Sequence, residues 1–193
     1  MIIDLTGSGR STVPPPEVDG TACPDHIDLT ICEPVLEGLQ RMGVDAAFAG
    51  SEQPSIHYPS CYLRDINPAH DVVAPAEGGE PGKISGNAQY RQRDVVIQHG
   101  SISYALEPDH HVGVFDVDLE PATFTDRVTS IREQVGIDRE EAVETLGAAL
   151  REWCDADDGG WRAAELEAAR ELTDHKYGAE SWIRDREALE VTR

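Results

Sequence analysis

Positive charge is scarce in this sequence, and lysine is almost absent from it. The 193 residues hold 16 lysines and arginines against 37 aspartates and glutamates, which gives a formal net charge of −21. Such a surface would repel nucleic-acid phosphates, so nucleic-acid binding is excluded as a function. The carboxylate excess, with only two lysines, favours a halophilic protein, because concentrated salt screens self-repulsion. An ordinary acidic protein is the alternative.

Long hydrophobic runs and paired cysteines are also missing. No apolar run approaches the roughly 18 residues that a membrane span needs, so we expect no membrane partner. The amino terminus lacks a basic segment followed by an apolar one. The four cysteines form no CxxC pair; they are Cys23, Cys32, Cys61 and Cys154. These absences predict reduced thiols and a cytoplasmic location.

The amino-terminal two thirds of the chain carry short strand signals and one helix. Residues 1–5 predict a strand, and a loop rich in glycine, serine and proline follows as far as Pro24. Residues 27–42 show helical spacing of apolar side chains. Further strands are predicted from short apolar runs at residues 46–48, 55–58 and 71–74.

A hairpin is the best-specified element of the sequence. Residues 84–90 and 95–104 predict two strands around a turn at residues 91–94. Strand alternation would place Lys83, Ser85, Asn87 and Gln89 on one face. Glycine and serine weaken a strand, so their presence at residues 85–86 and 100–101 indicates that a ligand approaches the backbone closely. A β-bulge is the alternative explanation.

The carboxyl-terminal third predicts helices. Asp138 followed by Glu141 is a helix start signal, and the apolar stripe after it runs to Trp153. A second helix is predicted at residues 161–177, with Trp161, Leu166, Ala169 and Leu172 in the core. The whole pattern predicts an α/β fold with a central mixed, largely antiparallel sheet flanked by helices. We expect a core over residues 1–136 and a helical segment over 137–193 packed on it.

Four motifs carry a family resemblance. They are Lys83-Ile-Ser-Gly-Asn-Ala-Gln-Tyr-Arg, Gln98-His-Gly-Ser, His70-Asp71-Val-Val and His175-Lys-Tyr-Gly-Ala-Glu-Ser-Trp. With them the sequence resembles the lipoate-protein ligase A family of the biotin/lipoate ligase group. The resemblance implies an ATP-dependent lipoate-protein ligase that forms lipoyl-AMP, with ATP and magnesium as cofactors and lipoate as substrate. Its partners would be lipoyl acceptor domains of 2-oxoacid dehydrogenases or glycine-cleavage proteins, modified on a lysine.

The same resemblance implies roles for particular residues. Lys83 matches the catalytic lysine, which contacts carboxyl and phosphate oxygens, and Asp71 lies at the nucleotide site although His70 stands where asparagine is common. The lipoyl and adenylate pocket is formed by Ser85, Gly86, Asn87, Ala88, His99 and Ser101. For His99, a hydrogen-bonded core histidine is an equal alternative. The chemistry independently needs a cation, because carboxylate attack on a phosphate brings two anions together.

One motif of the family has no counterpart. Its arginine-rich, triple-glycine segment would lie upstream of residues 1–5, and Gly7-Ser8-Gly9-Arg10 has neither its spacing nor a following helix. We therefore expect residues 1–136 to be an incomplete ligase-like core. A shortened gene product, half of a split enzyme with a partner chain that supplies the missing pocket, and a noncatalytic subunit or remnant all stay open.

Two other chemistries match residue types in the sequence. Cys61 lies in a region where related octanoyl transferases place a nucleophilic cysteine; such an octanoyl or lipoyl transferase would form a thioester and need no ATP. A buried, inert cysteine is the commoner case. Asp109-His110-His111 with Asp116 and Asp118 has the ligand types for a metal, but adjacent histidines in a strand point to opposite faces. A solvated acidic loop is favoured there, and no metal site is predicted.

Overall fold

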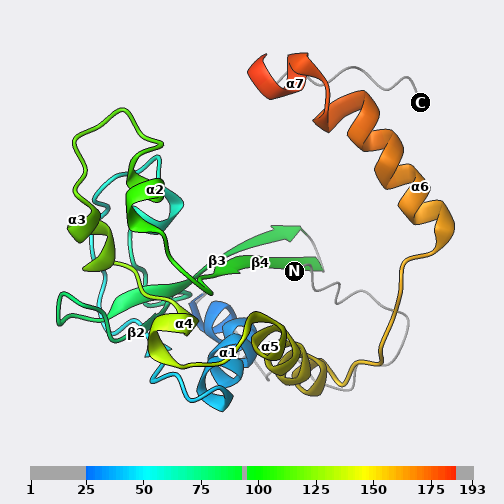
Figure 1. Cartoon of the computed structure of the whole chain (residues 1–193). Helices are drawn as coiled ribbons and strands as arrows, with labels where there is room; N and C mark the ends of the chain where they lie inside the picture. Colours follow the sequence, from blue (N-terminus) through cyan, green and yellow to red (C-terminus); the bar gives the residue numbers. More distant parts are fainter. Residues whose placement is uncertain (1–24, 93–94, 186–193) are drawn as a thin grey trace. The chain divides into compact units, whose positions relative to one another are not determined.

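The structure, a computed structural model, describes residues 25–92 and 95–185 (Figure 1). The predicted strand at residues 1–5, the loop as far as Pro24 and part of the hairpin turn lie outside these residues. The chain divides into two compact units, one that ends at Ala156 and one that begins at Asp157. The expected division into an incomplete ligase-like core over residues 1–136 and a helical segment over 137–193 packed on it stays a prediction.

A four-stranded antiparallel sheet forms the centre of the first unit. The strands are β1 (Ala47–Phe48), β2 (Val72–Ala74), β3 (Gly82–Gln92) and β4 (Val95–Ile102), in the spatial order β1-β2-β3-β4. The predicted hairpin is confirmed, with Asn87 opposite Gly100 and Ala88 opposite His99. The strand predicted at residues 55–58 is wrong. Pro54 and Pro59 flank that segment and lack the amide N–H that a sheet ladder needs, and it forms a loop.

Helices α1 (Asp25–Arg41) and α5 (Arg139–Cys154), both predicted as helices, lie side by side near the sheet (Figure 1). Gly38 lets the two helices approach, because a Cβ at this position would lie 2.7 Å from the Leu146 side chain. The predicted start of α5 is confirmed, since the Asp138 side chain accepts a hydrogen bond of 2.9 Å from the Glu141 amide.

Apolar side chains from the helices and the sheet form the main core. Its buried members are Val35, Leu39, Val44, Ala46, Val72, Ala74, Ile84, Ile131 and Ala142. A smaller cluster lies among η1 (Cys61–Leu63), α2 (Pro108–Val112) and α3 (Pro121–Thr125), and contains Leu63, Val112, Phe124 and Val128. The short helix α4 (Ile131–Gln134) precedes α5. The core therefore holds the helices on the sheet, while the smaller cluster holds the loops that carry Cys61.

The second unit consists of α6 (Ala163–Leu172), a π-helical turn η2 (Thr173–Tyr177) and α7 (Glu180–Asp185). The ammonium of Lys176 lies 4.6 Å from the ring centroid of Trp182. None of the side chains in these three segments is buried. Trp161, Leu166 and Leu172 are exposed, so their predicted core role is wrong. The unit contains no described sheet that could cover them.

Among the described residues, no helix is both long enough and apolar enough to cross a membrane. Cys32, Cys61 and Cys154 are free thiols. The cytoplasmic location and the halophilic character stay predictions.

Candidate functional site

A bulge in β3 decides where Lys83 lies. Val72 is paired with Ser85 and the next residue, Val73, with Lys83, so β3 has one extra residue, Ile84, at this point. An extra residue reverses the alternation of side chains along a strand. Lys83 therefore shares a face with Gly86 and Ala88, and the predicted face shared with Ser85 is wrong. This bulge lies between β2 and β3, whereas the alternative weighed from the sequence was a bulge within the hairpin, and the pairing of β3 with β4 is regular from Ser85 opposite Ile102 to Gln92 opposite Val95.

Lys83 lines a cavity of about 480 Å³ between the hairpin and the loop that precedes β2. Most of the predicted site residues line the same cavity: Cys61, Asp71, Gly86, Asn87, Ala88, His99 and Ser101. Ser85 is not among them; it is buried, and its Oγ accepts a 3.2 Å hydrogen bond from Asn87 Nδ2. The structure thus brings these residues together, while their individual roles stay predictions.

The ammonium of Lys83 is held by two oxygens. Its Nζ lies 3.0 Å from Asp71 Oδ2 and donates a 2.6 Å hydrogen bond to the Asp65 carbonyl. Lys83 is 6% exposed and Asp71 1% exposed, so the ion pair is buried. An ammonium has three donors, and the described residues use two of them. Among the described residues, the third N–H therefore has no acceptor.

The backbone at Lys83 is held as firmly as its side chain. Its amide donates to the Arg127 carbonyl at 2.9 Å, and its carbonyl accepts from the Thr129 amide at 3.1 Å. These two bonds join β3 to the segment that follows α3. The ammonium is therefore attached to a backbone that is fixed on both sides.

Asp71 is kept ionised by its neighbours. Burial alone would raise the pKa of its carboxyl, but three contacts together lower it: His70, the Asn67 amide and the Lys83 ammonium. Oδ2 accepts from the Asn67 amide at 2.9 Å, and His70 Nδ1 lies 3.4 Å from Oδ1. A carboxylate at neutral pH offsets the charge of Lys83 inside the protein.

Asn87 links the hairpin to the loop before β2. Its Nδ2 donates to the His70 carbonyl at 2.8 Å, and its Oδ1 accepts from Gln98 Nε2 at 3.3 Å. A Cβ at position 100 would lie 2.4 Å from Asn87 Oδ1 and 2.8 Å from the Gly86 carbonyl. Close packing within the hairpin therefore explains the glycine at position 100, without any ligand.

Cys61 is the first residue of η1 and is exposed to the cavity. Cys61 is therefore not buried, and its role as a nucleophile stays a prediction. Both of its neighbours in the chain are fixed: Ser60 Oγ lies 2.8 Å from His111 Nε2, and the Tyr62 ring packs edge-on against the His111 ring. The thiol thus lies on a short turn whose flanking side chains are anchored, and it faces the same space as Lys83.

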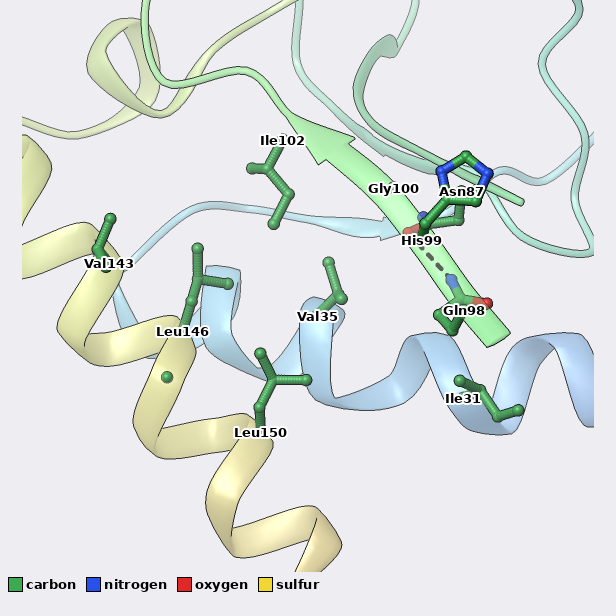
Figure 2. A pocket seen from close by; sticks show the side chains of 11 residues that line it. Ile31, Val35, Asn87, Gln98, His99, Gly100, Ile102, Val143, Leu146 and Leu150 are labelled. Atoms are coloured by element: carbon green, nitrogen blue, oxygen red, sulfur yellow. Dashed lines mark hydrogen bonds between the residues drawn. The ribbon is translucent and has the colours of Figure 1, made fainter. Parts of the chain in front are cut away.

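A second, apolar cavity of about 310 Å³ lies between α1, α5 and β4 (Figure 2). Figure 2 shows Val143, Leu146 and Leu150 of α5 on one side of it, and Ile31 and Val35 of α1 on another. It shares three lining residues with the cavity that contains Lys83: Asn87, His99 and Gly100. The two cavities therefore meet at the part of the hairpin where Asn87 pairs with Gly100.

Sequence reasoning missed Arg127, a second buried cation near the site. Its guanidinium donates to the Gln53 side chain and, at 2.9 Å, to the Pro54 carbonyl. Burial lowers its pKa, and the charges of Asp65 and Asp71 oppose that shift. Arg127 thus anchors the loop before η1, and no motif in the sequence marks it.

In the sequence, His111 belongs to a group of residues with the ligand types for a metal. It lies in the short helix α2, where the sequence interpretation assumed a strand, and its Nε2 contacts Ser60. The neighbouring His110 contacts the carboxylate of Glu107 at 2.6 Å. In the part of the chain that the structure describes, no three histidine, cysteine, aspartate or glutamate side chains are placed to hold a metal ion.

Comparison with known proteins assigns the family. Residues 25–151 match the model of the lipoyl protein ligase A/B catalytic domain. The chain belongs to this family. The resemblance drawn from the Lys83 motif is confirmed, as is the fold class.

The bi-partite lipoate protein ligase of Thermoplasma acidophilum has a similar fold, with a TM-score of 0.64 at 22% identity over 87% of this chain and 61% of that protein. A lipoate-protein ligase A bound with ATP matches with a TM-score of 0.59 at 21% identity over 83% of this chain and 59% of that protein.

The curated relatives that this chain matches are octanoyltransferases. The octanoyltransferase LipM of Kyrpidia tusciae is 31% identical over 166 residues, and that of Bacillus subtilis is 27% identical over 175 residues. Each match covers 79% of this chain and 58% of the relative, so the chain spans little more than half of their length. These relatives contradict the prediction of an ATP-dependent ligase that forms lipoyl-AMP. The predicted ATP and magnesium rested on that adenylate step.

Proposed function

We propose that this chain transfers an octanoyl or closely related lipoyl group through a thioester on Cys61. The observation that carries the proposal is the shared cavity, in which an exposed thiol faces a buried ammonium. The octanoyltransferase relatives support the same reaction class. A thiol nucleophile splits acyl transfer into two easier steps.

In the first step, the Cys61 thiolate attacks the carbonyl carbon of an acyl thioester. A new carbon–sulfur bond forms, the donor's carbon–sulfur bond breaks, and the donor thiolate takes up the proton that Cys61 lost. In the second step, the amine of an acceptor lysine attacks the Cys61 thioester, an amide forms, and the thiol of Cys61 is regenerated. The energy comes from the donor thioester, so ATP is not consumed.

Lys83 would stabilise the oxyanion that forms in both steps. A fixed N–H donor aimed at developing negative charge is typically worth about 10²- to 10³-fold in rate. Asp71 and the Asp65 carbonyl hold the ammonium in place before substrate arrives. Such preorganisation means that no group has to move when the charge develops.

An octanoyl chain needs apolar surface close to the reacting carbon. The apolar cavity lined by α1 and α5 shares Asn87, His99 and Gly100 with the cavity of Cys61. Its side chains are of the kind that favour an alkyl chain over water. For the acceptor, we propose a lysine of a lipoyl domain of a 2-oxoacid dehydrogenase or a glycine-cleavage protein, since the Thermoplasma ligase was studied with its E2 lipoyl domain.

The test is acyl transfer without ATP. The full chain is incubated with octanoyl-pantetheine and a purified lipoyl domain, and octanoylation of the domain is followed by mass spectrometry. We expect transfer by the wild-type protein and none by Cys61→Ser. Cys154→Ser is the matched control, because Cys154 is a free thiol outside the cavity lining. Transfer that requires ATP, or that persists in Cys61→Ser, would refute the proposal.

A further inference from the structure

His111 touches both residues that flank Cys61. On the amino-terminal side, its Nε2 lies 2.8 Å from the Oγ of Ser60, which is only 1% exposed. On the carboxyl-terminal side, its ring centroid lies 5.1 Å from that of Tyr62, in an edge-to-face arrangement. One side chain from α2 therefore contacts the residue before and the residue after the exposed thiol.

The His111 ring is itself held by aromatic neighbours. Its centroid lies 4.3 Å from that of Phe124 and 5.6 Å from that of Phe115. Phe124 is 1% exposed and belongs to the cluster under η1. Aromatic contacts of this kind stabilise a fixed arrangement beyond the area that they bury. His111 thus connects the buried ring of Phe124 to the two residues that flank Cys61.

We propose that His111 is a positioning residue for Cys61, fixing the backbone on both sides of the thiol so that Sγ faces the acyl carbon. The inference rests on the proposed function. It differs from a role in proton transfer, because His111 is not among the residues that line the cavity. Its described polar contact at Nε2 is the buried hydroxyl of Ser60, and not the reacting group.

The charge state of His111 suits this role. Burial lowers the pKa of its imidazole, so the ring is neutral at neutral pH. A neutral ring nitrogen can accept the hydrogen of the Ser60 hydroxyl, which a protonated ring cannot do. The neutral ring also avoids placing an uncompensated charge against Phe124 and Tyr62.

The test compares variants that remove the contact between His111 and Ser60 by changing one residue or the other. His111→Phe keeps a ring against Phe124 but removes the bond to Ser60, and Ser60→Ala removes the hydroxyl while leaving every ring in place. His110→Phe is the matched control, since His110 is the neighbouring, exposed residue of α2. Acylation of Cys61 by octanoyl-pantetheine is measured in single turnovers over a range of donor concentrations. Alkylation by iodoacetamide and the melting temperature are measured in parallel.

A misplaced reacting group typically costs up to about a hundredfold in rate. We expect each single variant to lower the maximal acylation rate constant about tenfold to a hundredfold, with little change in the half-saturating donor concentration. Iodoacetamide, a small reagent, should react at nearly the wild-type rate. The double variant should be no slower than the slower single variant, because both changes remove the same hydrogen bond between Ser60 and His111. His110→Phe should match the wild type.

Acylation at the wild-type rate in both His111→Phe and Ser60→Ala would overturn this inference and leave the proposed function standing. Losses that multiply in the double variant, or that follow the fall in melting temperature, would also overturn it, since they indicate general destabilisation. Ser60→Ala keeps the test decisive if His111→Phe does not fold. A wild-type chain that forms no Cys61 thioester would instead refute the proposed function, and this inference with it.

Discussion

The helix-covered part of the first unit and its loop-covered part are built in different ways. Beneath α1 and α5, the contacts are apolar and come from long, periodic segments. Around Cys61 and Lys83, the contacts are hydrogen bonds, an ion pair and aromatic rings from segments far apart in the sequence. The first part supplies stability, and the second part fixes chemical groups at some cost in stability. The following changes test this contrast, from the largest expected effect to the smallest.

Lys83→Met should have the largest effect. Loss of the proposed oxyanion donor should lower octanoyl transfer about 10²- to 10³-fold. The change also leaves the Asp71 carboxylate buried without its cation, which typically costs roughly 3–5 kcal/mol of stability. The rate of transfer to a lipoyl domain and the free energy of unfolding in urea measure the two effects.

The double variant Lys83→Met/Asp71→Leu separates these effects. Replacing a buried ion pair by apolar side chains is often neutral for stability, so the double variant should recover much of the lost free energy of unfolding. Transfer should stay as low as in Lys83→Met. Full activity in either variant would contradict the role of the ammonium.

Asp71→Asn should change how stability depends on pH. The folded-state pKa of Asp71 is lowered from the ordinary value of 3.8, so the carboxylate stabilises the fold above that value. This contribution is lost as the pH falls through the lower folded-state pKa. Compared with the wild type, Asp71→Asn should be less stable by roughly 3–5 kcal/mol at neutral pH. The difference in the free energy of unfolding between the two proteins should become smaller in acid. Urea unfolding over a pH series measures this difference, and a difference that does not change with pH would contradict the account.

Gly100→Ala should cost about 1–3 kcal/mol, because the added methyl group would overlap Asn87 Oδ1 at 2.4 Å. The variant should also slow transfer, since Asn87 holds the loop that carries His70. Gly147→Ala is the matched control: its Cβ meets only the end of the Arg151 side chain, at 3.5 Å, and alanine favours a helix. Thermal unfolding should therefore give opposite signs for the two changes, and equal signs would count against the packing argument.

Asp138→Ala should have the smallest effect. Loss of the cap on the Glu141 amide typically costs about 1 kcal/mol. The melting temperature should fall slightly while octanoyl transfer stays unchanged. A large loss of transfer would show that the apolar cavity lined by α5 depends on this cap.

The same contrast explains what could be predicted from the sequence. The helices at α1 and α5 and the hairpin of β3 and β4 follow local periodicity, capping and alternation, so they were predicted correctly. The sequence motif also identified most residues of the cavity, because β3, β4 and the segment before β2 carry them in three short blocks. Local sequence signals are sufficient where the structure of a segment depends on that segment alone.

Long-range contacts could not be predicted in this way. The position of Lys83 depends on a bulge whose presence is set by pairing with Val72 and Val73. His111 and Ser60 are separated by 51 residues, and Arg127 and Gln53 by 74 residues. Neither pair forms a motif. The Lys83 motif also does not distinguish ligase from transferase chemistry. The octanoyltransferase relatives contradict the ligase that was predicted from it.

The most direct measurement is the trapping of the acyl-enzyme. The full chain is mixed with octanoyl-pantetheine, quenched in acid and analysed by intact-mass and peptide mass spectrometry. The account predicts one octanoyl group on the peptide that contains Cys61, removed by neutral hydroxylamine and absent from Cys61→Ser. Octanoyl transfer to a lipoyl domain without any acyl group on Cys61 would contradict it.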